Sequence, residues 1–174
     1  MLLTLAFLLR APHFGNPVID IDEQFYLLVG DRMWGGDLPF VDHWDRKPFG
    51  LFLIYAATRL LGGEGIVQYQ LVAAFFAAGT ALLIALTAAR FAPLAGAVMA
   101  GICYLLWLLL FGGEGGQSPV FYNLPVAGAG ALALSAVTRP HFDRKAFLQG
   151  CLATFLAGIA LQIKYTVIFE GAFF

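Results

Sequence analysis

The sequence predicts an all-α fold, a bundle of membrane-spanning helices with short interfacial helices in an extracytoplasmic loop. Hydrophobic residues make up 60% of the 174 residues and charged residues only 12%, whereas soluble domains carry about 25% charged residues. Four apolar runs long enough to cross a bilayer follow one another from residue 66 onward. The charged residues gather in residues 20–50, which hold seven of the eleven acidic residues. These three observations together favour a polytopic membrane protein.

The chain opens with an apolar run at residues 1–9, which Arg10, Pro12 and a Gly-Asn-Pro turn are expected to end. A spanning helix needs about 20 residues, so this run is interpreted as the outer half of a first helix. The chain closes on two phenylalanines, again in apolar sequence. We therefore expect residues 1–174 to be one truncated transmembrane domain, the N-terminal part of a longer protein.

Residues 10–48 are expected to form the first extracytoplasmic loop. Asp20 and Glu23 have the spacing of a capping box, with Asp20 as the N-cap. Apolar residues then recur at helical spacing until Gly35-Gly36, which predicts an amphipathic helix over about residues 22–34. A helix of this kind lies in the membrane interface rather than crossing it.

Residues 49–61 are apolar but too few to cross a bilayer, and two glycines follow them. This length predicts a second interfacial helix. Each of the later runs is about 27 to 36 Å long as a helix, which is enough to span. The predicted transmembrane helices are residues 66–89, 91–111, 119–137 and 146–163.

Small residues at every fourth position predict the faces on which these helices pack, because such faces allow close approach in lipid. Two faces of this kind occur, one in each of two predicted spans. They are Ala73, Ala77, Ala81 and Ala85, and later Gly150, Thr154 and Gly158.

Basic residues predict the orientation. If residues 49–61 do not cross, Arg90 and the basic cluster at 139–145 share one side, and residues 20–50 share the other with the loop at 112–118. The positive-inside rule places the basic side in the cytoplasm. We expect a multi-pass protein of a bacterial cytoplasmic membrane. A net charge of −1 gives no basis for a nucleic-acid partner.

Asp22 is the first candidate for chemistry. It lies in the first turn of the predicted helix, where the helix dipole favours its ionised form, and it is not needed for the cap. Its carboxylate therefore suits a general base or a ligand for a divalent metal ion. A solvated loop acid is the alternative for Asp22, and capping alone explains Glu23.

Asp45, Arg46, Lys47 and Pro48 form the second candidate motif. Pro48 restricts the backbone of Lys47, and this lysine stands at the head of the second interfacial helix. At that depth its ammonium group would meet a lipid-linked phosphate. Anchoring of the helix at the interface by Trp44, Arg46 and Lys47 is the alternative.

The two motifs together resemble the first extracytoplasmic loop of the GT-C membrane glycosyltransferases. The likeness is to the branch with the protein O-mannosyltransferases and aminoarabinose transferases: Asp22-Glu23, an aromatic-rich helix, a Gly-Gly-Asp turn and then Asp-Arg-Lys-Pro before an apolar helix. Phe49 stands where a second proline is usual in that family. The resemblance implies transfer of a sugar from a polyprenyl-phosphate donor to an acceptor outside the cytoplasm.

The resemblance also implies roles for single residues. Asp22 would be the essential catalytic carboxylate of the loop, acting as a general base or as a metal ligand. Glu23 would be a supporting catalytic carboxylate. Lys47 would bind the donor phosphate, with Asp45 and Arg46 beside it. A divalent metal ion is the one cofactor suggested, and the acceptor is not identified.

Glu114 is a further candidate for substrate binding, because its glycine-rich loop is predicted to face the same side as Asp22. A flexible turn explains the glycines equally well.

Two other classes of function stay open. A transporter or flippase segment would bind its substrate near the bilayer midplane, often at intramembrane charges, whereas the predicted spans contain no Asp, Glu, Lys or Arg. A structural membrane protein would use the acidic loop to bind a partner.

Overall fold

The structure is a computed structural model that describes residues 1–141 and 143–173. The described residues form helices, and the only extended pairing among them is an isolated bridge between Pro39 and His43. This confirms the predicted all-α class. The helices are α1 Leu2–Arg10, α2 Ile21–Trp34, α3 Phe49–Thr58, α4 Ile66–Ala88, α5 Leu94–Leu110, α6 Ser118–Val137, α7 Arg144–Leu161 and α8 Ile168–Phe173.

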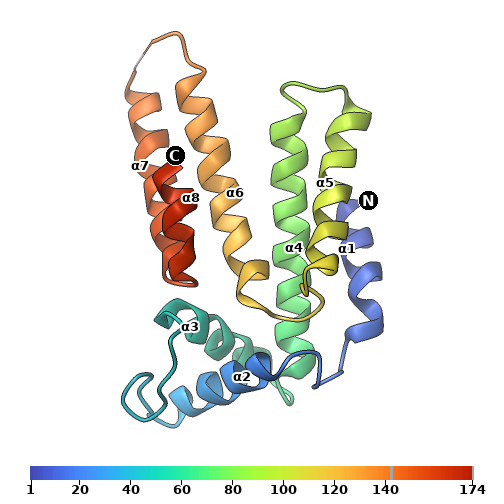
Figure 1. The fold of residues 1–174 in the computed structure, drawn as a ribbon, viewed down its shortest axis with the longest axis vertical. Coiled ribbons are helices and arrows are strands. Elements are labelled where there is room, and N and C mark those ends of the chain that lie inside the picture. The colour runs from blue at the N-terminus through green and yellow to red at the C-terminus, as the bar shows by residue number, and fades with distance from the viewer. Residues whose placement is uncertain (142, 174) are drawn as a thin grey trace.

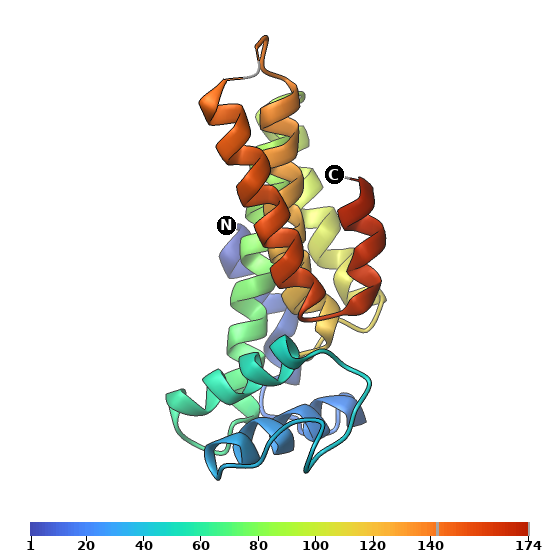
Figure 2. The ribbon, with the colours of Figure 1, turned by 90° about the vertical axis from the view of Figure 1, so that its left-hand side faces the viewer.

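The longer helices stand side by side, and α2 and α3 lie across one end of them (Figures 1 and 2). Three of the long helices, α4, α6 and α7, are long and apolar enough to cross a membrane. The helix α5 has only 17 residues, fewer than the run predicted at 91–111. It starts late because Pro93 is its N-cap and disfavours helical backbone in the residue before it.

The central helix is α4, which packs against α1, α5 and α6. Its predicted small-residue face is buried: Ala73, Ala77 and Ala81 have no exposed surface. The second predicted face, on α7, is not packed, since a methyl group added at Gly150 or Gly158 would meet nothing within 4 Å.

The helices α2 and α3 form a closely packed pair at the end of the bundle. They cross at Gly30, where an added Cβ would lie 2.7 Å from the backbone nitrogen of Ala56. Trp34 Nε1 donates to the Ala56 carbonyl at 2.9 Å, and Arg59 Nε lies 2.8 Å from Asp31 Oδ1. A larger residue at position 30 would force the two helices apart.

Asp20 is the N-cap of α2, as predicted, and accepts the Asp22 backbone N–H at 2.9 Å. The other half of the predicted capping box is wrong, because Glu23 accepts the Tyr69 hydroxyl at 2.9 Å instead. Glu23 lies on the face of α2 that packs against the bundle. From there its carboxylate reaches the partner on α4 rather than the backbone of Asp20.

The acidic loop and the basic cluster, which the predicted orientation places on opposite sides of the membrane, lie at opposite ends of the bundle (Figure 1). Residues 20–50 and the loop at 112–117 lie at the end covered by α2 and α3. The α4–α5 and α6–α7 connections, which carry Arg90 and the basic cluster, lie at the far end. The described chain therefore has one mixed-charge end and one basic end.

Candidate active site

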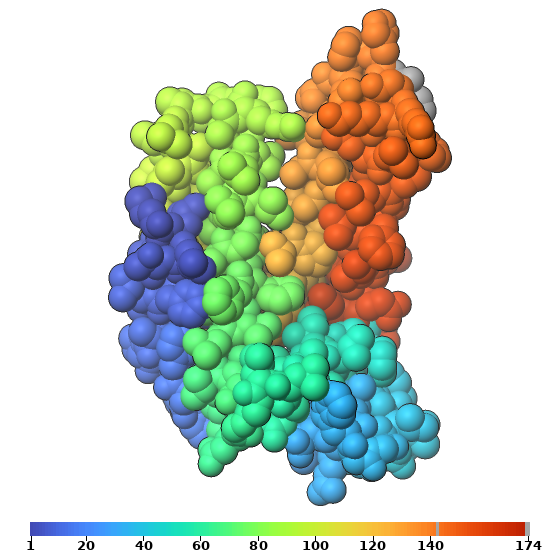
Figure 3. Space-filling model, turned by 180° about the vertical axis from the view of Figure 1, so that it is seen from behind, coloured from blue at the N-terminus to red at the C-terminus, as the bar shows by residue number. Residues whose placement is uncertain are grey.

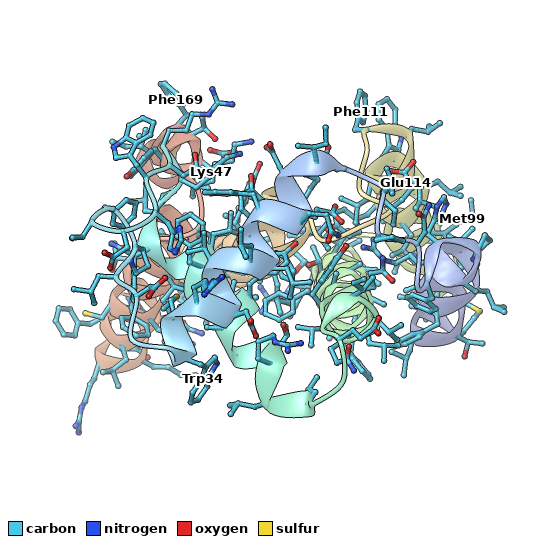
Figure 4. All side chains as sticks on the ribbon, turned by 90° about the horizontal axis from the view of Figure 1, so that it is seen from below. Trp34, Lys47, Met99, Phe111, Glu114 and Phe169 are labelled. Carbon is cyan, nitrogen blue, oxygen red and sulfur yellow. The ribbon has the colours of Figure 1, made fainter. Side chains whose placement is uncertain are left out.

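Asp22 and Lys47 lie side by side although 24 residues separate them. Lys47 Nζ is 3.6 Å from Asp22 Oδ2, because the loop after α2 turns back along that helix before α3 begins (Figures 2 and 4). Tyr26, one helical turn after Asp22, donates its hydroxyl to Asp22 Oδ2 at 3.0 Å. The ammonium group of Lys47 also lies 5.5 Å from the centre of the Tyr26 ring, within cation–π range.

The two charges of this pair differ in exposure. The Asp22 side chain is 48% exposed and the Lys47 side chain only 13%. Tyr26 is fully buried, and burial, together with its bond to Asp22, raises the pKa of its phenol. Tyr26 therefore remains a hydrogen-bond donor that orients a carboxylate open to solvent.

Lys47 also lines a cleft of about 250 Å³ that is rich in cations. The third cation, Lys164, comes from the segment after α7. The residues around the cleft include no carboxylate; they are Arg46, Lys47, Pro48, Lys164, Tyr165 and Thr166. Burial lowers the pKa of Lys164, and the charges of Lys47 and Arg46 lower it further. Like charges held this close favour an anionic ligand.

Gly50 explains why Lys47 and Lys164 meet. A Cβ at position 50 would lie 2.5 Å from the Gln162 carbonyl oxygen, so the first turn of α3 approaches the end of α7 backbone to backbone. Lys47 precedes Gly50 by three residues, and Lys164 follows Gln162 by two. Lys164 directly follows the last predicted span, which predicts its place at the same end of the bundle as Lys47, but no sequence pattern predicts that the two lysines line one cleft.

Glu23 has different surroundings from Asp22. It is fully buried and accepts the Tyr69 hydroxyl. Burial raises the pKa of Glu23 to about 7, an effect that the hydrogen bond from Tyr69 partly offsets, with a smaller contribution from the charge of Arg10. Glu23 was expected to be a supporting acid beside Asp22, but the structure places it in the interior.

The interior network around Glu23 holds the glycine-rich loop in place. The Arg10 guanidinium donates to the carbonyls of Gly113 and Gly115, and the Tyr55 hydroxyl donates to the Gly116 carbonyl at 2.9 Å. Both Gly115 and Gly116 are buried, with Glu23 directly against Gly115. The loop predicted to be a flexible turn is therefore anchored by α1, α2 and α3.

The remaining candidate residues divide between the cleft and other places. Arg46 lines the cleft, and Asp45 Oδ1 accepts the Arg46 backbone N–H at 2.5 Å. Glu114 lies on the opposite side of α2 from Lys47 (Figure 4). The structure thus brings together Asp22, Arg46 and Lys47, and leaves Glu114 apart from them.

A metal ion at Asp22 would find few protein ligands. Over residues 1–141 and 143–173, no group of three or more His, Cys, Asp or Glu side chains could hold one, and Lys47 already lies against the Asp22 carboxylate. A divalent ion at Asp22 therefore stays a prediction.

Comparison of the chain with protein-family models, with curated proteins and with solved structures finds no match.

Proposed function

We propose that this protein is a polytopic membrane glycosyltransferase that takes a sugar from a polyprenyl-phosphate donor. The cationic cleft beside an exposed carboxylate, at one end of an apolar bundle, carries the proposal. Such a cleft suits a lipid-linked phosphate, and the carboxylate suits an acceptor hydroxyl.

The membrane placement rests on the apolar sides of the bundle. The helices α4, α6 and α7 have the length and composition of spanning helices, and large apolar side chains are exposed along the long helices, among them Phe75, Leu82, Trp107 and Phe155. In this placement α2 and α3 lie at the outer interface. The basic end faces the cytoplasm, and a bacterial cytoplasmic membrane is the expected location.

In the proposed reaction the Asp22 carboxylate takes the proton from a hydroxyl group of the acceptor molecule. The oxygen of that hydroxyl group bonds to the anomeric carbon of the donor sugar. The bond between that carbon and the phosphate oxygen breaks, and its electron pair leaves with the polyprenyl phosphate. Lys47, Arg46 and Lys164 stabilise the charge that develops on the phosphate. The products are the glycosylated acceptor and the lipid phosphate, with the proton on Asp22.

The other candidate residues have lesser roles in this proposal. Tyr26 orients Asp22, and Asp45 positions the backbone of Arg46. Glu23 anchors the glycine-rich loop rather than reacting. Glu114 could contact an acceptor only from the other side of α2, so we give it no part in the chemical step.

The test is sugar transfer by the full-length protein from a radiolabelled polyprenyl-phosphate donor. Asp22→Asn is expected to lower kcat/KM about 100-fold or more, the usual effect of losing a general base. Asp31→Asn, on the outer face of the same helix, should stay within about threefold of wild type, because surface ion pairs contribute little. Unchanged transfer by Asp22→Asn would overturn the catalytic assignment. Uptake of the sugar into liposomes without a covalent product would instead support a transporter.

A further inference from the structure

A second cleft lies near the basic end of the bundle, far from Asp22. It has a volume of about 490 Å³ and runs between α4, α6 and α7. Figure 3 shows the hollow between α4, in green, and α6 and α7, in orange. Most of its wall is apolar, with Leu83 and Leu86 on one side and Leu132 and Leu156 on the other.

Three polar side chains, one from each helix or its end, meet in this cleft. Arg90 Nη2 donates to Ser135 Oγ at 3.3 Å, and Gln149 Nε2 donates to the same oxygen at 3.0 Å. The Gln149 Oε1 atom is buried without a partner among the described residues. The Arg90 guanidinium and the Ser135 hydroxyl at one end of an apolar groove match the chemistry of a phosphate ester attached to a hydrocarbon chain, while the free Gln149 oxygen can accept only from a hydroxyl or amine of the head group.

The charge of this cleft is uncompensated. Arg90 is the one cation that lines it, and its lining residues include no carboxylate. The acid at this end, Asp143, is already paired with Arg139 at 2.9 Å. Arg90 makes no ion pair with any residue in the described part of the chain. An anionic group is therefore the complementary ligand.

We propose that this cleft binds one phospholipid from the leaflet opposite the active site. Its phosphate lies against Arg90 and Ser135, and one acyl chain lies along the groove toward Leu83 and Leu156. The inference rests on the membrane placement proposed above but not on the transfer reaction. Basic pockets between transmembrane helices on the cytoplasmic side are known to suit lipid head groups, and a chain in the groove gains van der Waals contact with α4, α6 and α7.

The lipid would also join two parts of the bundle. The groove has α4 on one wall and the α6–α7 pair on the other, so a bound chain contacts both. Lipid binding should therefore raise the melting temperature of the protein as well as be detectable by mass.

The experiment uses the full-length protein, delipidated in mild detergent and titrated with phosphatidylglycerol, with bound lipid counted by native mass spectrometry. Wild type is expected to retain one phosphatidylglycerol and to melt at a higher temperature with it. Arg90→Gln should bind it about fivefold more weakly, the effect of one basic residue on an anionic head group. Arg144→Gln removes an exposed arginine at the same end, outside the cleft, and should bind as wild type does.

Two further arms separate the alternatives. Glycerol 3-phosphate, which has no acyl chain, should give no thermal protection, and Ala131→Leu, which fills the groove, should lower lipid retention while leaving the charge unchanged. Equal retention by Arg90→Gln and Arg144→Gln would overturn the proposal. So would a cross-link from Leu86→Cys to another segment of the protein, which would show that a helix covers the groove.

Failure of this inference is distinguishable from failure of the proposed function. Arg90→Gln should leave sugar transfer within about threefold of wild type, because sites that are far apart act independently. For the same reason Asp22→Asn should leave lipid retention unchanged.

Discussion

Asp22 and Glu23 are adjacent carboxylates on one turn of α2, and their surroundings are opposite. The Asp22 side chain is 48% exposed and lies 3.6 Å from Lys47, whereas Glu23 has no exposed surface and lies against the glycine-rich loop. Successive residues on a helix point about 100° apart. Asp22 therefore faces the loop that carries Lys47, and Glu23 faces the bundle.

Under the proposed function, this difference lets one helix serve two purposes. The exposed acid keeps its carboxylate available to a second molecule, with a cation and a tyrosine to orient it. The buried acid uses its carboxylate on Tyr69 and on the loop that closes the end of the bundle. Changes near Asp22 should therefore alter activity, and changes near Glu23 should alter stability.

The largest expected effect is a loss of stability at the buried contact between Glu23 and Gly115. Gly115→Ala would place a methyl group against the Glu23 carboxylate and is expected to lower the free energy of unfolding by about 2 to 3 kcal/mol. Thermal unfolding of the purified full-length protein in detergent measures this. Gly150→Ala is the matched control, because nothing lies within 4 Å of its added methyl group. Equal melting temperatures for the two variants would show that the loop is not tightly packed.

The next prediction is that the pH dependence of stability comes from Glu23 and not from Asp22. The folded-state pKa of Glu23 is raised from 4.5 to about 7, so folding favours its protonated form. Its stabilising contribution is complete below about pH 4.5 and is lost as the pH rises through about 7, a change of about 1 to 3 kcal/mol. Unfolding measured from about pH 5 to about pH 8 should show this slope in wild type and in Asp22→Asn. Glu23→Gln should flatten it, and a slope that persists in Glu23→Gln would exclude Glu23 as its source.

On the exposed side, Lys164→Gln tests the cationic cleft. Under the proposed function the variant removes one of three cations from the donor phosphate, so KM for the lipid-linked sugar is expected to rise about tenfold, which corresponds to about 1.4 kcal/mol. Steady-state transfer by the full-length protein measures it. Lys145→Gln removes an exposed lysine at the other end of the bundle, and its KM should match that of wild type. A Lys164→Gln enzyme with unchanged KM would separate Lys164 from the donor site.

The smallest expected effect is that of Tyr26→Phe. The ring remains beside Lys47, but Asp22 loses one oriented donor, so kcat should fall about threefold to tenfold with KM little changed. Tyr69→Phe removes the matching bond to Glu23 and should lower the melting temperature while leaving kcat near that of wild type. If both variants behaved alike, the two acids would not have separate roles.

Much of the fold follows from sequence patterns. Apolar length predicts α4, α6 and α7, the Asp20 cap predicts the start of α2, and glycine and proline breaks predict the end of α2 and the start of α3. The predicted helix at 49–61 continues only to Thr58 as an α-helix and ends in a 3-10 turn. The 3.6 Å separation of Lys47 and Asp22 brings together the two motifs on which the family resemblance rests.

Other features depend on tertiary contacts that periodicity does not contain. The burial of Glu23 depends on the rotation of α2 about its axis, which the packing on Tyr69 fixes. The place of Lys164 depends on a backbone contact at Gly50, and a single sequence does not identify which glycine makes such a contact. Glu114 shares an end of the bundle with Lys47, but chain direction does not predict on which side of α2 it lies.

Direct binding of polyprenyl phosphate to the full-length protein in detergent tests the cationic cleft most directly. Lys47→Gln is expected to weaken binding about tenfold, and the double variant Lys47→Gln with Lys164→Gln about 100-fold, because each cation contributes about 1.4 kcal/mol. Lys145→Gln should bind as wild type does. Equal affinities for wild type and the double variant would contradict the assignment of this cleft to a lipid-linked phosphate.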